Sequence, residues 1–186
     1  MAEVKRCAWA QGSDNMVRYH DTEWGTPCHD DAKLFEFLLL ESFQAGLSWA
    51  CVLNKRENFR RALDGFDPQK IAQYGEDKLS SLLEDASIIR SRRKLEAAVN
   101  NARIFLDMQR EFGSFDAYLW QFTQGKTVHS HSVPMPASTP LSDSISKDLK
   151  RRGMKYVGTV IVYSYLQAVG IVDDHEPDCF RHGGRA

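Results

Sequence analysis

The sequence lacks any apolar run of the roughly 18 residues that a membrane-spanning helix needs. Its first ten residues also lack the apolar core of a signal peptide. A net charge is nearly absent, because 24 Lys and Arg oppose 25 Asp and Glu to leave −1. We therefore expect a cytoplasmic protein with no membrane partner and no global basic field, in which only local patches could attract a polyanion.

Cysteine is also scarce, and four residues in a cytosolic chain of 186 do not suggest a disulfide framework. Repeats and low-complexity segments are absent too. The chain is 42% hydrophobic and 11% aromatic, which is ample for a packed core. We expect one domain over 1–186, with an irregular N-terminal arm over 1–30, a helical body over 31–170 and a C-terminal tail over 171–186.

The body is predicted to be all-α. Leu34, Phe35, Leu38 and Leu39 follow the spacing of one helical face. About eight helices are expected, over 30–42, 45–63, 67–74, 75–85, 90–113, 114–122, 142–153 and 157–170. The polar stretch 123–143, with its three prolines, is expected to be a loop. The β-branched run 159–165 could form a strand by propensity, but its continuation to Gly170 favours a buried helix.

Soft-metal ligands stand at both ends of the body. Cys7 and His20 precede it, and His175 and Cys179 follow it four residues apart. Two thiolates and two imidazoles make a complete tetrahedral set for zinc, with no open position for catalysis. The alternative is a buried thiol and surface histidines in a coincidental arrangement. Such a metal would tie the N-terminal arm to the C-terminal tail.

Two basic patches follow. The first, "RSRRK" (90–94), is most simply a solvated helix face. The second lies on a predicted helix–turn–helix hairpin, whose turn contains Gly153, Lys155 and Gly158 before a helix that begins at Thr159. Glycines let a backbone approach a ligand closely, and amides at a helix start suit a phosphate. The second patch therefore predicts a contact with phosphates that does not read sequence.

An aromatic cluster surrounds one acid. The N-terminal arm carries Trp9, Tyr19 and Trp24, while Glu41 and Trp49 lie in or near the next two helices. Glu41 interrupts an apolar run, and a carboxylate there needs a partner. It could pair with an arginine or cap a helix. It could also bind the edge of a flat, electron-poor or cationic ring that is sandwiched between the aromatic side chains.

Eight segments, taken in order, carry a resemblance to a known family. They are "RCAW", "YHDTEWG", "LFEFLLLESFQAGLSW", "VLNKRENFRRA", "FDP", "IIRSRRKLEAAVNNA", "LKRRGMKYVGTVIVYSYLQAVG" and "DHEPDC". Together they resemble the 3-methyladenine DNA glycosylase I family of bacterial alkylation-repair enzymes over nearly all of 5–180. The resemblance implies a fold of the helix–hairpin–helix glycosylase superfamily. It also implies one structural zinc per chain.

The resemblance assigns roles residue by residue. It implies zinc ligands at Cys7, His20, His175 and Cys179. It implies a base pocket with Glu41 as the catalytic residue that hydrogen-bonds the base, and with base-binding aromatic residues at Tyr19, Trp49, Trp9 and Trp24. DNA contacts are implied at Gly46, Leu47, Gly153, Lys155, Gly158 and Thr159.

Two departures from this pattern need comment. Met16 stands where some family members carry another pocket aromatic. Asp173 and Asp174 stand near the place of a catalytic aspartate in related glycosylases. We interpret these two acids as helix-end polarity or as a hydrogen-bond partner for His175, and we do not count them as catalytic.

The implied activity is hydrolysis of the N-glycosidic bond of 3-methyladenine in double-stranded DNA. The enzyme would flip the nucleotide, release free 3-methyladenine and leave an abasic site without cutting the strand. A monomer in the bacterial cytoplasm, associated with the nucleoid when acting, is expected. Two alternatives remain open from the residues: a non-enzymatic, zinc-stapled module that binds damaged DNA or methylated base, and a DNA-binding regulator that uses the hairpin alone.

Overall fold

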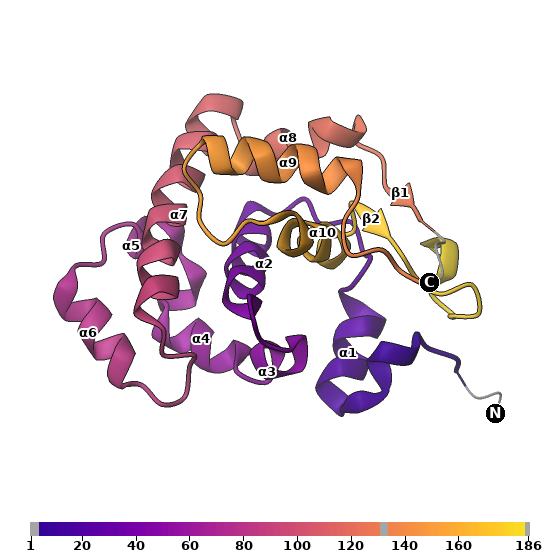
Figure 1. The fold of residues 1–186 in the computed structure, drawn as a ribbon, viewed down its shortest axis with the longest axis horizontal. Coiled ribbons are helices and arrows are strands. Elements are labelled where there is room, and N and C mark those ends of the chain that lie inside the picture. Colours follow the sequence, from indigo (N-terminus) through magenta and orange to yellow (C-terminus); the bar gives the residue numbers. More distant parts are fainter. Residues whose placement is uncertain (1–3, 131–133, 185–186) are drawn as a thin grey trace.

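The computed structural model describes residues 4–130 and 134–184. Within them the chain is mainly α-helical, as the sequence predicts, and ten α-helices are present (Figure 1). Their bounds are α1 Asp14–Thr22, α2 Asp31–Gln44, α3 Trp49–Leu53, α4 Arg56–Ala62, α5 Pro68–Ile71, α6 Glu76–Glu84, α7 Arg92–Phe112, α8 Phe115–Trp120, α9 Pro140–Arg151 and α10 Thr159–Ala168.

Short 3-10 helices and two strands complete the described structure. The 3-10 helices are η1 Ala8–Gly12, η2 Asp64–Phe66, η3 Gln121–Thr123 and η4 His182–Gly184, and the strands are β1 Val128–His129 and β2 Val172–Asp173. The strands pair in parallel, with Val128 opposite Val172 and His129 opposite Asp173. A sheet with two residues per strand adds little stability, but its pairing holds the loop after η3 against the C-terminal tail.

The N-terminal arm is more regular than expected. Residues 1–30 were predicted to be irregular, but η1 and α1 lie within them. The side chain of Ser13 accepts a hydrogen bond from the backbone N–H of Met16 and so caps α1. Tyr19 and His20 are buried on this helix. The sequence prediction therefore missed α1, although Ser13 is a residue type that commonly caps a helix.

The single helix predicted over 45–63 is wrong. The structure has two helices there, α3 and α4, separated by Asn54 and Lys55. Residues 45–48 form a turn in which Gly46 has a φ of +78°. Ser48 ends this turn because its side chain accepts from the backbone N–H of Cys51 and caps α3. The turn therefore projects from the end of α2 rather than continuing a helix.

Helix α2 forms the centre of the fold (Figure 1). Ten consecutive residues, Leu34 to Phe43, are buried, as expected for a helix with neighbours on all sides. It packs against α3, α7, α8 and α10. The run 159–165 lies in α10, which confirms the buried helix predicted there. Packing of α10 against both α2 and α9 explains why the β-branched residues are helical, since burial overrides propensity.

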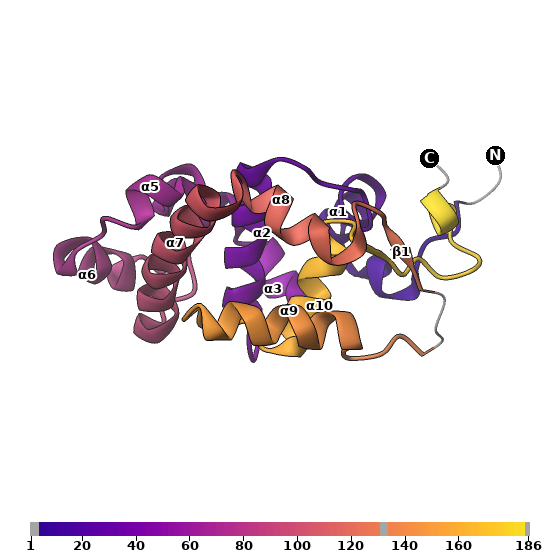
Figure 2. The same ribbon diagram turned by 90° about the horizontal axis from the view of Figure 1, so that it is seen from above.

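The long connection between α8 and α10 holds more structure than the predicted loop over 123–143. Strand β1 lies inside it, and α9 begins at Pro140 within the same stretch. Thr139 and Ser142 form a capping box at the start of α9. Seen from above, α9 and α10 lie along the same edge of the molecule as the start of α7 (Figure 2).

The described parts of the N-terminal arm and of the C-terminal tail lie together (Figures 1 and 2). Phe180 donates its backbone N–H to the carbonyl of Lys5 at 2.9 Å. The arm also crosses the end of α10, where Cys28 donates to the carbonyl of Val169 at 3.0 Å. Within the described residues, no helix combines the length and the apolar character needed to cross a membrane.

Candidate active site

A cavity of about 300 Å³ opens between α1, α2, α3 and α10. It brings together all five residues that the sequence assigned to a base pocket, namely Trp9, Tyr19, Trp24, Glu41 and Trp49. They come from η1, α1, the turn after α1, α2 and α3. The sequence separates Trp9 from Trp49 by forty positions, so only the packing of the arm against α2 and α3 creates the site.

The carboxyl group of Glu41 is buried at this cavity, and no ion pair or hydrogen bond from a described residue offsets its burial. Its side chain is only 2% exposed, and its Oε2 has no hydrogen-bond partner among the described residues. Burial raises the pKa of Glu41 to about 8. The interpretation that Glu41 pairs with an arginine is wrong. Arg56 and Arg60 instead bind Glu36, at 2.7 and 2.5 Å.

This burial predicts how stability changes with pH. Glu41 keeps its proton up to about pH 8 when folded, whereas its ordinary pKa is 4.5. The folded state therefore binds the extra proton between these values, and the free energy of unfolding falls as pH rises through them. For Glu41→Gln, we expect this fall to be reduced by up to about 1.4 kcal/mol per pH unit. Denaturant titrations of both proteins at pH 5, 6, 7 and 8 measure the difference, and parallel pH profiles would contradict a buried, unpaired carboxyl.

Aromatic rings form the walls around this carboxyl. The rings of Trp9 and Trp24 meet edge-on with centroids 4.9 Å apart, and those of Tyr19 and Trp49 lie 5.1 Å apart. The indole N–H groups of Trp9 and Trp49 are buried without a partner among the described residues. A cavity with two free N–H donors, one free carboxyl and aromatic walls is suited to a flat ligand with polar edges.

Five further residues line the cavity that were not assigned to it from the residues themselves: Met16, Gln44, Met135, Ser164 and Gln167. Met16 had been noted only as a departure from the family pattern, and it is buried in the wall. Ser164 and Gln167 stand three residues apart on α10, so they share one face of that helix. That polar pair inside an apolar helix was the signal available in the sequence.

Asp174 contacts the cavity only through a neighbour. Its Oδ2 accepts from the amide of Gln167 at 2.5 Å and from the hydroxyl of Tyr163. Asp173 instead accepts at Oδ1 from Nδ1 of His175, at 2.7 Å. The interpretation of Asp173 as a hydrogen-bond partner of His175 is thus confirmed, and neither acid lines the cavity among the residues described.

A second cluster lies beside the cavity. The ligand atoms of Cys7, His20 and Cys179 all lie within 4.8 Å of one another, and all three residues are buried. Burial lowers the pKa of His20, which keeps its imidazole neutral, the form that binds metal. Burial also raises the pKa of the Cys7 thiol to about 12, so a thiolate there needs a cation beside it. The donor set is compatible with a structural metal.

His175 lies beside this cluster. Its ring centroid is 5.1 Å from that of His20. Its Nδ1 is held by Asp173, and its Nε2 is buried with no partner among the described residues. An imidazole whose second nitrogen is fixed by a carboxylate is the usual arrangement of a metal-binding histidine. The orphaned Nε2 is therefore suited to act as a fourth ligand, although it lies farther away than the 4.8 Å that encloses the ligand atoms of Cys7, His20 and Cys179.

The cluster adjoins the wall of the cavity. The ring of Trp24 lies 4.7 Å from that of His175, and the ring of Trp9 lies 5.4 Å from that of His20. Tyr19 directly precedes His20 on α1. Two of the aromatic walls, Trp9 and Trp24, thus pack against these two histidines, and Tyr19 adjoins one of them in the chain.

The turn between α9 and α10 is held from outside. Asn101 of α7 donates to the carbonyl of Lys155 at 2.9 Å and accepts from its backbone N–H at 2.8 Å. Gly153 has a φ of +98°, which favours glycine. The side chain of Lys155 is exposed. The hydroxyl of Thr159 donates to Asp143 at 2.6 Å. Its side chain is therefore engaged within the fold, and its backbone N–H is the group left for a phosphate.

The turn between α2 and α3 carries the other predicted DNA contacts. Leu47 is 41% exposed, which is unusual for a leucine, and a side chain at Gly46 would meet nothing within 4 Å. Gln44, at the end of α2, lines the cavity directly before this turn. The exposed apolar tip therefore stands at the rim of the pocket.

Known proteins are similar to this chain in sequence and in fold. A family model for methyladenine glycosylase matches residues 9–182. DNA-3-methyladenine glycosylase 1 of Escherichia coli (strain K12) is 43% identical over 184 residues, which cover 97% of this chain and 98% of that protein. A crystal structure of a 3-methyladenine DNA glycosylase I is 45% identical with a TM-score of 0.92, covering 96% of this chain and 100% of that one.

A further solved structure, a variant of 3-methyladenine DNA glycosylase I in complex with 3-methyladenine, is 36% identical with a TM-score of 0.90 and covers 94% of this chain and 95% of that one. The sequence, the arrangement of helices and the extent of the match agree. The chain belongs to the methyladenine glycosylase family.

Proposed function

We propose that this protein removes 3-methyladenine from alkylated double-stranded DNA by hydrolysing its N-glycosidic bond. The observation that carries the proposal is the buried, unpaired carboxyl of Glu41 inside a cavity walled by aromatic rings. The relatives with this fold are named for the same activity, and one was solved with 3-methyladenine bound.

Recognition of the base follows from the charge of the lesion. Methylation at N3 makes the adenine cationic, and a cation near Glu41 lowers the pKa of its carboxyl and favours ionisation. The ionised carboxylate then accepts hydrogen bonds from the edge of the base. Trp9, Tyr19, Trp24 and Trp49 are the proposed aromatic walls, whose faces attract a cationic ring. Neutral adenine leaves the burial of the carboxylate uncompensated, which explains the selection of the methylated base.

The chemistry needs little help once the base is held. The bond between C1′ and the base breaks with its electron pair moving to the base, which leaves as a neutral molecule. Water attacks the oxocarbenium-like C1′ and loses a proton, which produces an abasic site. No protonation of the leaving group is required, because the cationic base already leaves as a neutral molecule. The described lining includes no lysine that could form a Schiff base, which favours a monofunctional enzyme.

The DNA must present the base outside the duplex. Flipping costs a few kcal/mol, and this cost falls for a damaged base. Gly46 and Leu47 are proposed to fill the gap in the stack, because Leu47 is an exposed apolar tip beside the pocket. Gly153, Lys155, Gly158 and Thr159 are proposed to bind phosphates as the hairpin of a helix–hairpin–helix motif. The exposed ammonium of Lys155 and the first amides of α10 support this assignment.

Cys7, His20, His175 and Cys179 are proposed to hold one structural zinc ion per chain. Zinc accepts this mixture of thiolate and imidazole ligands, and a closed set of four supplies folding energy rather than catalysis. The ion would join the arm over 1–30 and the tail over 171–186 into a single domain with the helical body. We propose that this domain acts as a monomer in the cytoplasm.

The DNA product tests the function. After incubation with alkylated duplex DNA, we expect strands that remain whole until hot alkali breaks them at abasic sites. A non-enzymatic module that binds damaged DNA would leave the alkali-labile sites at the level of a sample without protein. Strand breaks before alkali treatment would contradict the monofunctional mechanism.

Removal of one zinc ligand tests the metal site. For Cys179→Ser, we expect loss of zinc and a lower unfolding temperature, because the closed ligand set contributes to folding. The single-turnover rate of base release by molecules that remain folded should change little. Cys51→Ser is the matched control, since Cys51 lies in α3 away from the cluster. A fully stable Cys179→Ser protein without metal would refute a structural role.

A further inference from the structure

The four basic residues around the start of α7 fall into two groups, two with partners inside the fold and two without a partner among the described residues. Arg92 binds Glu76 at 2.8 Å, and the ammonium of Lys94 is also used inside the fold. Arg90 and Arg93 are exposed, and neither has a hydrogen bond or ion pair to any residue in 4–130 or 134–184. Two guanidinium groups at this position are therefore available to an external anion without breaking an internal pair.

Lys94 fixes this end of α7 beside the turn that carries Gly46 and Leu47. Its ammonium donates to the carbonyls of Phe43 and Ala45, at 2.7 and 2.6 Å, which lie at the end of α2. Gly46 and Leu47 follow directly. Because Arg93 directly precedes Lys94, it lies at the end of α7 that Lys94 ties to the end of α2.

The same helix also holds the α9–α10 turn. Asn100 donates to the carbonyl of Gly153 at 2.9 Å, and Asn101 binds the backbone of Lys155. Arg93 and Asn100 are seven residues apart, so they share one side of α7 at a separation of about 10 Å along its axis. That separation equals about three base-pair steps of 3.4 Å along one strand.

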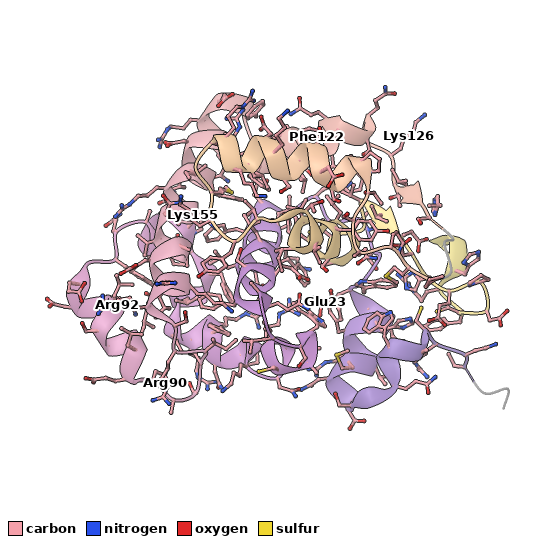
Figure 3. All side chains as sticks on the ribbon, in the orientation of Figure 1. Glu23, Arg90, Arg92, Phe122, Lys126 and Lys155 are labelled. Carbon is pink, nitrogen blue, oxygen red and sulfur yellow. The ribbon has the colours of Figure 1, made fainter. Side chains whose placement is uncertain are left out.

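The views of the molecule agree with this placement. The start of α7 reaches the same edge as α9 and α10 when the molecule is seen from above (Figure 2). Arg90 and Lys155 are labelled on the same flank of the molecule, whereas Lys126 lies at the opposite upper corner (Figure 3). The start of α7, Arg90 and Lys155 therefore lie along one margin of the molecule, and the contacts of Lys94 tie the start of α7 to the end of α2.

We propose that Arg90 and Arg93 form a second clamp on the DNA backbone, which binds phosphates flanking the flipped nucleotide. This inference rests on the proposed function, because it assumes that the margin faces DNA. A guanidinium binds a phosphate through two parallel hydrogen bonds and remains charged at any physiological pH. The clamp reads no sequence, so it supports the search for lesions on undamaged DNA as well as binding at the lesion.

The salt dependence of binding to an undamaged duplex tests the clamp. For the double variant Arg90→Ala/Arg93→Ala, we expect weaker binding and a slope of log affinity against log salt that is shallower by about 1.8, since each phosphate contact contributes about 0.9. Both side chains are exposed, so the unfolding temperature should match that of the wild type.

Arg110→Ala/Lys126→Ala is the matched control. It also removes two exposed positive charges, at the far end of α7 and on the connection before β1. We expect its slope to equal that of the wild type. Equal slopes for the two double variants would overturn the clamp and leave 90–93 as a solvated helix end. Because the duplex is undamaged, this result does not depend on base release, which tests the proposed function separately.

Discussion

Replacement of Glu41 by glutamine should lower the single-turnover rate of 3-methyladenine release by roughly 10- to 100-fold. A hydrogen bond to a charged group is worth about 1.5–3 kcal/mol, and about 1.36 kcal/mol is a tenfold change in rate. Glutamine keeps the shape of the side chain and one acceptor oxygen, but it cannot ionise opposite the cationic base. The fold and the metal content should remain those of the wild type, because Oε2 of Glu41 has no partner among the described residues.

Glu36→Gln is the matched control for this experiment. Glu36 is a second buried glutamate on α2, at 8% exposure, but it binds Arg56 and Arg60 on another side of the helix. Its replacement should cost stability, since Arg56 and Arg60 lose the carboxylate that they share, and should leave base release by folded molecules nearly unchanged. Wild-type rates for Glu41→Gln, or equal losses for both variants, would contradict the role assigned to Glu41.

Replacement of Gly25 by alanine should abolish metal binding and strongly destabilise the protein. A Cβ at this position would lie 2.5 Å from Cε1 and 2.9 Å from Nδ1 of His175. The ring of His175 is held by Asp173 and packs against Trp24, so it cannot move without loss of both contacts. We expect the loss of stability to exceed that of the control variant Gly65→Ala by more than about 2 kcal/mol, a large effect for one methyl group.

Gly65→Ala separates the clash from backbone strain. Gly65 has a φ of +75°, close to the +70° of Gly25, but a Cβ there would meet nothing within 4 Å. It should cost only the strain of a left-handed alanine, about 1–2 kcal/mol, and should retain its metal. Metal analysis and denaturant unfolding of both variants give the comparison. A metal-loaded Gly25→Ala protein as stable as Gly65→Ala would show that His175 does not take part in the site.

The sequence predicted the long helices because their signals are local. Helix α7 was expected to end at Gly113, and it does, with a φ of +84° at that glycine. The buried character of α10 was also predicted, because the mainly apolar segment continues past the β-branched run to Gly170. These features depend on hydrophobic periodicity and on glycines that end helices, both of which a single sequence displays.

The shorter elements could not be predicted in the same way. The break between α3 and α4 depends on a cap at Ser48 and on the turn at Gly46, neither of which interrupts the apolar pattern around it. Helix α1 owes its burial to contacts between the arm and the rest of the fold, which are separated in sequence. Tertiary packing decides such elements, and local propensity does not.

The candidate site shows the same division. The aromatic residues and Glu41 could be proposed from the sequence, but the state of the carboxyl could not. Two buried glutamates lie five positions apart on α2, and only the structure shows that Glu36 takes the arginines while Glu41 remains unpaired. Gln167 was missed because it lies in an apolar helix far along the chain, and its packing brings it to the same cavity.

Chromatography of the bases released from methylated duplex DNA tests the central claim most directly. The cavity, its unpaired carboxyl and its aromatic walls predict that the wild-type protein releases free 3-methyladenine and leaves unmodified adenine in the DNA. A base fraction without 3-methyladenine, or one in which unmodified adenine is released at a comparable rate, would contradict it.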